Sequence, residues 1–254
     1  MTLNIDLSEH TALITGATGQ LGRVMVKTLA QAGASIAIHF NKNKQSAFEI
    51  KESLKDFGVK TCIVQCDVTD LESVMKMKNE VESLIGNPDI VITNAVSQIF
   101  PWRTVLEEDI KDYEDQFKSS VMQNVNMAKA FVPHMQRSKW GRFIGINTEC
   151  TIQTFETQSA YVSGKKGMDG VLRVLAKEIG PYNITVNQIA PGWTVSYKDR
   201  ENGTEEQPEY SNNIPLRRRG TDQEIANVAA FLASDLASFI TGALIPVTGG
   251  NAVL

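Results

Sequence analysis

The sequence predicts an α/β fold of the doubly wound type, in which helices cover both faces of a parallel seven-stranded sheet within a single domain. Short apolar runs alternate along the chain with longer stretches of helical period. Most of the short runs carry no alternating polar face, which is typical of parallel strands that are buried on both sides. The 254 residues show no internal period and 42% of them are hydrophobic, so we expect one large core rather than a repeat array or a disordered chain.

Seven segments have the length and the apolar, β-branched composition of strands. In chain order, the predicted strands are His10–Thr15, Ser35–Phe40, Thr61–Val64, Ile90–Thr93, Arg142–Asn147, Thr185–Ile189 and Leu244–Val247. Parallel strands joined through helices wind with one hand, and such sheets bind ligands outside the carboxyl ends of their strands. Functional side chains are therefore expected just after these segments.

The segments between the strands carry apolar residues three and four positions apart, which is the period of a helix with one buried face. The predicted helices are Leu21–Ala32, Gln45–Phe57, Leu71–Leu84, Asp109–Met135, Ala160–Ile179 and Asp222–Ala233. The stretch 193–220 has no clear period and is too long for an ordinary connection. Such a stretch is either disordered or a lid over the site, and we expect a lid.

The charge and the hydropathy pattern narrow the range of partners. The formal net charge is -4 and no basic face is present, so no nucleic acid partner is expected. No apolar run approaches the ~18 residues that a membrane span needs. Residues 1–10 lack the basic start and apolar run of a leader. We therefore expect a cytoplasmic protein without membrane association.

The cysteines and histidines give no sign of a metal site. The chain has three cysteines, and Cys62 and Cys66 share one face of a predicted strand, so we expect them to be core thiols. His10, His39 and His134 lie far apart in the sequence without other ligands at metal-binding spacing. We interpret the histidines as surface or packing residues and predict no metal.

The first predicted strand runs into a glycine-rich turn and then into a helix. The turn reads Thr15-Gly16-Ala17-Thr18-Gly19-Gln20-Leu21-Gly22. Unpaired N–H groups and the positive end of the helix dipole favour a phosphate at such a helix start. Glycine spacing alone would also fit a plain tight turn, but the position after the first strand favours a dinucleotide. We predict that the cofactor contacts Gly16, Thr18, Gln20, Leu21 and Gly22.

The residues after the second predicted strand bear on the choice between NAD and NADP. In many dinucleotide folds a carboxylate at this place binds the ribose hydroxyls and repels a 2'-phosphate. Here the chain reads Phe40-Asn41-Lys42 without an acid nearby, and Lys44 follows. The lysines could also merely solvate the next helix. We expect NADP, bound through Lys42 with help from Asn41 and Lys44, and NAD stays the alternative.

Tyr161 and Lys165 lie one helical turn apart at the start of a predicted helix. A nearby ammonium group favours the phenolate, so we expect the pKa of Tyr161 to be lowered and its phenol to act as an acid/base. The pair alone would also fit a surface contact. Thr148, at the end of the fifth predicted strand, could hold a carbonyl oxygen beside the phenol, so three groups are predicted to converge at one edge of the sheet.

Taken together, these motifs resemble the short-chain dehydrogenase/reductase family over the whole chain. The resemblance rests on the glycine turn, Cys66-Asp67-Val68, Thr93-Asn94-Ala95, the Tyr161 and Lys165 pair, Pro191-Gly192, Ile214-Pro215-Leu216 and Val247-Thr248-Gly249-Gly250. It is strongest to the single-domain branch that includes the 3-oxoacyl-acyl-carrier-protein reductases. It implies a Rossmann fold and hydride transfer between a nicotinamide cofactor and a carbonyl or alcohol.

The resemblance also implies roles for individual residues. Tyr161 would be the acid/base, Lys165 would hold the nicotinamide ribose and Thr148 would orient the carbonyl. The other implied cofactor contacts are Asp67 and Val68 at the adenine, Asn94 and Ala95 at the ribose, and Pro191, Gly192 and Thr194 at the nicotinamide. A homo-oligomer, most simply a tetramer, is a further implication.

The chain departs from the family pattern at residues that matter for binding and proton transfer. Gln20 takes the place of the second glycine of the turn, and Val96 adds bulk where the family has a glycine beside the cofactor. Ser120 stands where the family has the Asn of a water-mediated proton relay to the lysine. Asn124, one helical turn on, is the only nearby substitute. We expect a slower or altered relay.

Five aromatic residues lie near strand ends or in 193–220 and are candidates for an apolar substrate pocket, with ordinary packing as the alternative. They are Phe100, Trp102, Phe155, Trp193 and Tyr197. Glu149 and Cys150, directly after Thr148, receive no role.

The predicted function is that of an oxidoreductase that transfers a hydride between NADP(H) and a small carbonyl compound or secondary alcohol. Residues 1–254 are expected to form one dinucleotide-binding catalytic domain, with 193–220 as its substrate lid. The departures at Gln20, Val96 and Ser120 leave an alternative, a nucleotide-binding regulatory or structural protein with little redox activity. A non-redox elimination or dehalogenation by the same Thr-Tyr-Lys group is a third possibility.

Overall fold

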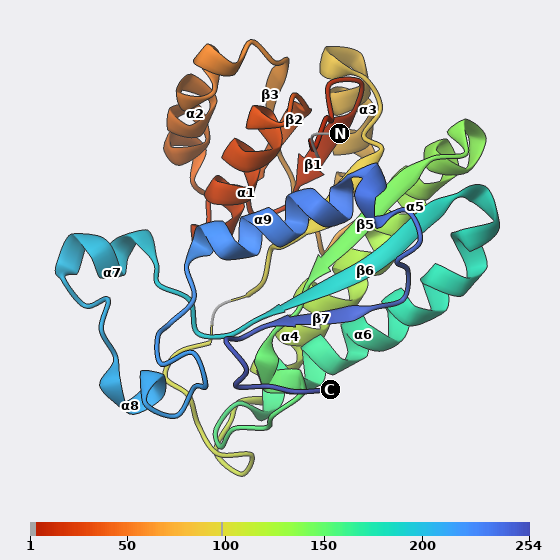
Figure 1. The fold of residues 1–254 in the computed structure, drawn as a ribbon. Helices are drawn as coiled ribbons and strands as arrows, with labels where there is room; N and C mark the ends of the chain where they lie inside the picture. Colours follow the sequence, from red (N-terminus) through yellow and green to blue (C-terminus); the bar gives the residue numbers. More distant parts are fainter. Residues whose placement is uncertain (1–3, 98) are drawn as a thin grey trace.

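The computed structural model describes residues 4–97 and 99–254, so residues 1–3 and 98 of the predicted domain lie outside the described part. Seven strands form one sheet in the order β3-β2-β1-β4-β5-β6-β7 (Figure 1). The strands are β1 (Thr11–Ile14), β2 (Ser35–Phe40), β3 (Thr61–Gln65), β4 (Ile90–Thr93), β5 (Gly141–Ile146), β6 (Ile184–Pro191) and β7 (Leu244–Val247). Every pair of neighbours is parallel, which confirms the predicted fold class.

The strand order reverses beside β1, which pairs with β2 on one side and with β4 on the other. Ala12 lies opposite Ile36 of β2 and Ile90 of β4. A crevice opens at the carboxyl end of a sheet where the strand order reverses in this way, and ligands of doubly wound folds bind there. The fold therefore places its binding edge directly after Ile14 and Thr93.

Two layers of helices cover the sheet, each closing its own apolar core (Figure 1). The helices α1 (Gln20–Gln31), α2 (Lys44–Ser53) and α9 (Asp222–Ala233) pack on one face, and α3 (Leu71–Ile85), α5 (Gln123–Ser138) and α6 (Ser159–Ile179) pack on the other. Successive strand residues alternate between the layers. In β1, Ala12 and Ile14 join the first core and Leu13 joins the second. Cys62 and Cys66 are free and buried in the second core, as predicted.

The helix predicted over Asp109–Met135 contains a change of winding. It consists of α4 (Ile110–Gln116), a π-helical turn η2 (Phe117–Met122) and α5. Segments of this kind often occur at functional sites because the wider turn re-aims the backbone. The turn packs tightly on α6, where a Cβ on Gly167 would come 2.7 Å from Cγ2 of Val121. The sequence does not predict this turn, because the spacing of apolar residues continues through it unchanged.

The stretch 193–220 contains regular structure as well as loops. It contains α7 (Tyr197–Asn202) and α8 (Pro208–Ser211), which are too short to show a period. Ser196 and Asp199 form a reciprocal capping box at the start of α7. Arg219, only 4% exposed, donates hydrogen bonds to the carbonyls of Trp193 and Thr194 and to Asp199. The two ends of the stretch are therefore tied together.

Short 3₁₀ turns complete the structure. They are η1 (Lys55–Phe57), η3 (Glu149–Thr151), η4 (Gly180–Tyr182) and η5 (Asp235–Ala237). The first of them shows that the helix predicted over Gln45–Phe57 ends earlier, at Ser53, before a separate turn that closes at Gly58 in the left-handed region. Within the described residues, no helix combines the length and the apolar content needed to cross a bilayer.

Candidate active site

The turn between β1 and α1 has the features of an anion site. Gly16 has a φ of +61°, and a Cβ there would come 3.0 Å from the Cα of Ala95. The helix α1 starts after Gly19 with no side-chain cap and no acidic residue in its first turn. Its first N–H groups thus have no side-chain acceptor, and they carry the positive end of the helix dipole. This end of α1 can receive a phosphate.

Buried hydrogen bonds hold this turn against β4. The Asn94 side-chain amide donates to the carbonyls of Thr15, at 3.0 Å, and Gly16, at 3.1 Å. The Thr15 hydroxyl accepts from the N–H groups of Asn94 and Ala95 and donates to Gln123 Oε1 at 2.6 Å. Because each partner is fixed by another, the turn cannot shift without breaking several buried hydrogen bonds.

A first cavity of about 560 Å³ follows the carboxyl ends of β1 to β4. Ten of the residues predicted to contact the cofactor line it: Gly16, Thr18, Gln20, Leu21, Asn41, Lys42, Asp67, Val68, Asn94 and Ala95. Val96, the predicted added bulk, also lines the cavity. The structure thus brings together residues from four separate strand ends.

Other predicted cofactor residues lie outside this first cavity. A Cβ on Gly22 would come 2.3 Å from the carbonyl oxygen of Gly16, so the glycine serves the close packing of α1 on the turn. Pro191 ends β6, and Gly192 after it lines a second cavity. Thr194 is buried, and its carbonyl accepts a hydrogen bond from Arg219 at 2.8 Å.

The ribose end of the first cavity is polar and lacks a carboxylate after β2. Asn41 and Lys42 are exposed there, and Lys42 forms no ion pair within the described part of the chain. Lys44 does not line the cavity, contrary to its predicted supporting role. It begins α2, and its ammonium lies 5.8 Å from the centre of the Phe48 ring.

His39 and Arg23 belong to this region although the sequence analysis gave them no role there. His39 is buried, and its Nδ1 accepts a hydrogen bond from the Gly16 N–H at 2.9 Å while Nε2 donates to the Cys66 carbonyl at 3.0 Å. Burial lowers the pKa of His39 to about 4, so the imidazole is neutral. Arg23 donates to the Thr18 carbonyl and stacks on Tyr197. The only feature of the sequence that could have indicated this role is the position of His39 near the end of β2.

Thr148, Tyr161 and Lys165 come together between β5 and α6, as predicted. Thr148 is buried just beyond β5, and its backbone N–H donates to Asn147 Oδ1 at 2.8 Å. The Thr148 side chain lies close enough to Tyr161 to act on the pKa of its phenol. The ammonium of Lys165 is buried, lies 5.9 Å from the centre of the Tyr161 ring and donates to the Ile146 carbonyl at 2.6 Å. A hydroxyl, a phenol and a cation thus share one edge of the sheet.

The predicted lowering of the pKa of Tyr161 is wrong for this structure. Burial and, to a smaller extent, the neighbouring Cys150 raise it to about 12, while the Thr148 side chain acts in the opposite direction. Burial also lowers the pKa of Lys165 to about 8. Lys165 is removed from water and Tyr161 is partly so, and this disfavours the charged form of each. The phenol therefore stays protonated, as a proton donor must be.

Ser120 lies in the π-helical turn, fully buried, and its hydroxyl oxygen has no hydrogen-bond partner among the described residues. Asn124 is already engaged, because its amide donates to the Ser120 carbonyl at 2.6 Å and its Oδ1 accepts from Thr93 at 2.7 Å. Of the two residues that the sequence offered for a relay, Ser120 is the one with a free polar atom.

A second cavity, of about 540 Å³, lies beside Thr148. Its walls are Trp102, Thr148, Glu149, Cys150, Phe155, Gln158, Gly192, Trp193 and Tyr210. Trp102 also meets Tyr161 edge to face at 5.9 Å between ring centres. Three of the five predicted aromatic residues therefore line this cavity. Phe100 is 88% exposed and Tyr197 stacks on Arg23, so these two lie elsewhere.

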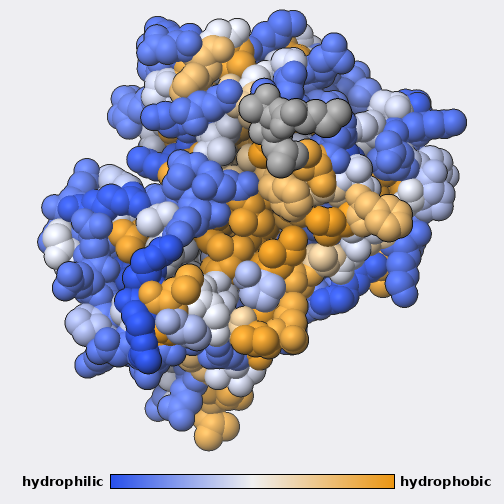
Figure 2. Space-filling model, viewed as in Figure 1, coloured by the Kyte–Doolittle hydropathy of each residue, from blue (hydrophilic) through white to orange (hydrophobic). Residues whose placement is uncertain are grey.

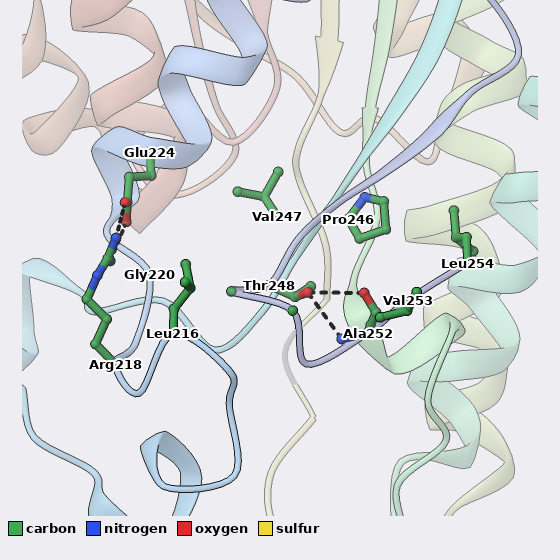
Figure 3. A pocket seen from close by; sticks show the side chains of 12 residues that line it. Leu216, Arg218, Gly220, Glu224, Pro246, Val247, Thr248, Ala252, Val253 and Leu254 are labelled. Atoms are coloured by element: carbon green, nitrogen blue, oxygen red, sulfur yellow. Dashed lines mark hydrogen bonds and ion pairs between the residues drawn. The ribbon is translucent and has the colours of Figure 1, made fainter.

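A third cavity, of about 430 Å³, lies beside β7 and the C-terminal residues (Figure 3). Arg218 and Glu224 form an ion pair at its edge, with 2.6 Å between nitrogen and oxygen, and Thr248 bonds to Ala252. None of the predicted catalytic or cofactor residues lines it. The third cavity therefore lies apart from the predicted site residues.

Known proteins of the same architecture identify the class. Residues 16–252 match the family model described as Enoyl-(Acyl carrier protein) reductase. The chain is 31% identical over 248 residues to the 3-oxoacyl-(acyl-carrier-protein) reductase FabG of Aquifex aeolicus, covering 98% of this chain and 99% of the relative. It is 34% identical over 250 residues to the enzyme of that name in Pseudomonas aeruginosa, covering 97% and 98%.

Solved structures agree. A gluconate 5-dehydrogenase from Burkholderia cenocepacia, in complex with NADP and tartrate, superposes with a TM-score of 0.88 and 25% identity over 98% of this chain and 97% of that one. The acetoin dehydrogenase YohF from Salmonella typhimurium gives a TM-score of 0.85 and 25% identity over 95% and 96%. The fold and the site define an NAD(P)-dependent oxidoreductase. The chain belongs to the short-chain dehydrogenase/reductase family.

Proposed function

We propose that this protein reduces a small ketone or aldehyde with NADPH, or oxidises the corresponding alcohol with NADP, and that Tyr161 transfers the proton. The observation that carries the proposal is the meeting of Thr148, Tyr161 and Lys165 between the two cavities. The first cavity would take the cofactor and the second the substrate, with the reacting carbon between them.

The residues present suit a dinucleotide. The uncapped start of α1 would bind the pyrophosphate, and the glycine at position 16 lets the turn pack closely against Ala95. Lys165 would hold the nicotinamide ribose, and Gly192 would border the nicotinamide. A bound nicotinamide would supply or accept the hydride at the carbonyl carbon. Lys42, exposed at the ribose end, supports NADP over NAD, in keeping with the NADP complex of the gluconate dehydrogenase.

The protein side chains would handle the proton. In the reduction direction, Thr148 donates a hydrogen bond to the carbonyl oxygen and the Tyr161 hydroxyl gives its proton to the same oxygen, so that the ketone becomes an alcohol. The ammonium of Lys165 stabilises the phenolate that remains. The buried, unpartnered hydroxyl of Ser120 would bind the water that returns a proton toward Lys165.

The proposal extends to the segment 193–220 and to assembly. Trp193 and Tyr210 of this segment line the second cavity, which supports its role as a substrate lid. Figure 2 shows apolar side chains gathered on the face that carries the edge strand β7, whose residues are only partly buried, and Phe239 nearby is fully exposed. An apolar sheet edge of this kind supports a symmetric homo-oligomer, which we take to be the family-implied tetramer.

The test is a panel of ketones and aldehydes with NADPH and of alcohols with NADP, followed by nicotinamide absorbance. We expect turnover of at least one pair of substrates and a loss of about 10²–10⁴-fold in kcat for Tyr161→Phe. Binding of NADPH by the variant, measured by nicotinamide fluorescence, serves as the control. Undiminished turnover by Tyr161→Phe would overturn the proposed role.

A further inference from the structure

The second cavity contains a buried carboxylate that the reaction itself does not need. Glu149 is only 4% exposed, although it lies beside Thr148 at the start of η3. Its Oε1 accepts from the Tyr210 hydroxyl at 2.7 Å and its Oε2 from the Asn251 amide at 2.9 Å. These are two of about four acceptor positions of a carboxylate. Both donors are neutral, so the negative charge keeps no counter-charge.

The two buried cations beside Trp193 and Tyr161 are committed elsewhere. Arg219 lies over the Trp193 ring at 4.7 Å, but it pairs with Asp199 at 3.0 Å and donates to backbone carbonyls. Lys165 donates to the carbonyl of Ile146, the last residue of β5, at 2.6 Å. Neither cation lines the cavity, and Glu149 forms no ion pair within the described residues.

A second polar group of the cavity also requires a donor. The Oε1 atom of Gln158, at the start of α6, is buried and has no hydrogen-bond partner among the described residues. An acceptor buried in this way costs free energy until something donates to it. With Gln158 beside it in the wall, Glu149 calls for an occupant that brings N–H or O–H groups.

Aromatic rings form much of the remaining wall. Trp102, Phe155, Trp193 and Tyr210 all line the cavity, and the last two meet edge to face with 5.4 Å between ring centres. The face of an aromatic ring is electron-rich and attracts a cation. Rings around an uncompensated carboxylate therefore favour positive charge and disfavour negative charge in the same space.

We propose that the substrate is an amino ketone or amino alcohol, whose protonated amine contacts Glu149 while its carbonyl or hydroxyl group lies at Thr148 and Tyr161. This inference rests on the proposed function and specifies its substrate class. An ammonium group supplies up to three N–H donors and the missing counter-charge together. The hydroxyl groups of a neutral polyol supply donors only, so the charge of Glu149 would stay uncompensated.

The test compares methyl ketones of equal chain length that end in an ammonium, a methyl, a hydroxyl or a carboxylate group. With NADPH, we expect kcat/KM to be about ten to a hundred times higher for the ammonium ketone than for the methyl ketone, the size of one charge-assisted hydrogen bond. The carboxylate ketone should be the poorest substrate. Equal or higher kcat/KM for the hydroxyl ketone would overturn the proposal in favour of a polyol.

Glu149→Gln removes the charge and keeps the shape. We expect the ratio of kcat/KM for the ammonium ketone over the methyl ketone to fall to about one in this variant. Glu156→Gln is the matched control, because Glu156 is exposed on the same loop outside the cavity, and it should keep the parent ratio. A parent-like ratio in Glu149→Gln would overturn the proposal. The substrate series on the unmodified protein decides the question even if that variant does not fold.

Binding separates this inference from the proposed function. The amino alcohol and the corresponding hydroxy acid are titrated into the protein with bound NADPH, and the fluorescence of Trp102 and Trp193 is followed. We expect a Kd at least about tenfold lower for the amino alcohol. Selective binding of the amine without any turnover would overturn the proposed reaction alone. Turnover of ketones without preference for the amine, in rate or in binding, would overturn this inference alone.

Discussion

The imidazole of His39 accepts a hydrogen bond from the backbone N–H of Gly16, at 2.9 Å, within the turn that opens the cofactor cavity. The same ring donates to the Cys66 carbonyl after β3, so it connects the ends of three strands. Only the neutral ring can do both, because protonation would turn the accepting nitrogen into a donor facing another donor. His39 is therefore a positioning residue for the phosphate turn, and its protonation state is coupled to folding.

This coupling predicts a loss of stability in mild acid. The pKa of His39 is about 4 in the folded protein and ~6.5 in an unfolded chain. The unfolded state therefore binds a proton in the window from about pH 6.5 down to about 4 while the native state does not, and stability falls as pH falls through it. The full loss is about 3 kcal/mol at 1.36 kcal/mol per pH unit. Urea unfolding between pH 7 and pH 4.5 measures it.

His39→Gln should remove most of this slope, since the amide can accept and donate without titrating. The matched control is His134→Gln, because His134 lies in α5 away from the phosphate turn. This variant should keep the dependence of stability on pH. An unchanged pH slope in His39→Gln would contradict the assignment.

The 2'-phosphate prediction now concerns Lys42 alone. Lys42 lines the first cavity and Lys44 does not, so Lys42→Ala should weaken NADPH binding about tenfold while Lys44→Ala leaves it unchanged. NADH binding should be the same in both variants. The Kd values come from nicotinamide fluorescence titrations, and equal losses in the two variants would contradict the assignment.

The reverse change introduces a carboxylate at the ribose end. Phe40, which precedes the site, is 3% exposed and packs in the first core, so an acid there would disrupt folding. Asn41 is exposed and lines the cavity, and Asn41→Asp should shift the preference toward NADH by repelling the 2'-phosphate. A parent-like ratio of the two Kd values in this variant would count against the proposed ribose position.

The buried ammonium of Lys165 predicts an alkaline limit on reduction. Its pKa is lowered to about 8, so the charge that stabilises the Tyr161 phenolate is present below this pH and is lost above it. The kcat for ketone reduction should therefore fall as pH rises through about 8. Lys165→Arg keeps a charge at all these pH values. Its profile should stay flat to about pH 10, whatever its absolute rate.

Lys166→Arg is the control for that profile, because Lys166 is the exposed neighbour on the same helix. The Lys166→Arg variant should retain the fall in kcat near pH 8. If Lys165→Arg retained this fall as well, a group other than Lys165 would control it.

The elements that the sequence predicted well are those whose signal is local. Each strand is rich in apolar residues, and the residues directly after a strand fall at one edge by topology, which is why Asn94 and Thr148 were found. The π-helical turn was missed because its apolar pattern continues that of the helices around it. Glu149 was missed because its role depends on Tyr210, 61 residues away. The raised pKa of Tyr161 depends on burial, which spacing does not reveal.

The closure of the segment 193–220 depends on Arg219. Its guanidinium donates to the carbonyls of Trp193, Thr194, Thr204 and Glu205 and pairs with Asp199. Because Arg219 is buried, Arg219→Met would remove the counter-charge of Asp199 and a donor to each of these carbonyls, at a cost of about 3 kcal/mol in local stability. A protease specific for glutamate should then cleave at the exposed Glu205 and Glu206 much faster than in the parent, as followed by mass spectrometry.

The same change tests whether the segment covers the substrate. Trp193 and Tyr210 line the second cavity and move with the segment, so Arg219→Met should raise KM for the carbonyl substrate about tenfold or more while the Kd for NADPH changes little. Arg217 lies two residues away and is exposed. The control variant Arg217→Met should therefore be cleaved by the protease, and should turn over the carbonyl substrate, at the rates of the parent. Faster cleavage of Arg219→Met with an unchanged KM would show that the segment is anchored by Arg219 but does not act as a lid.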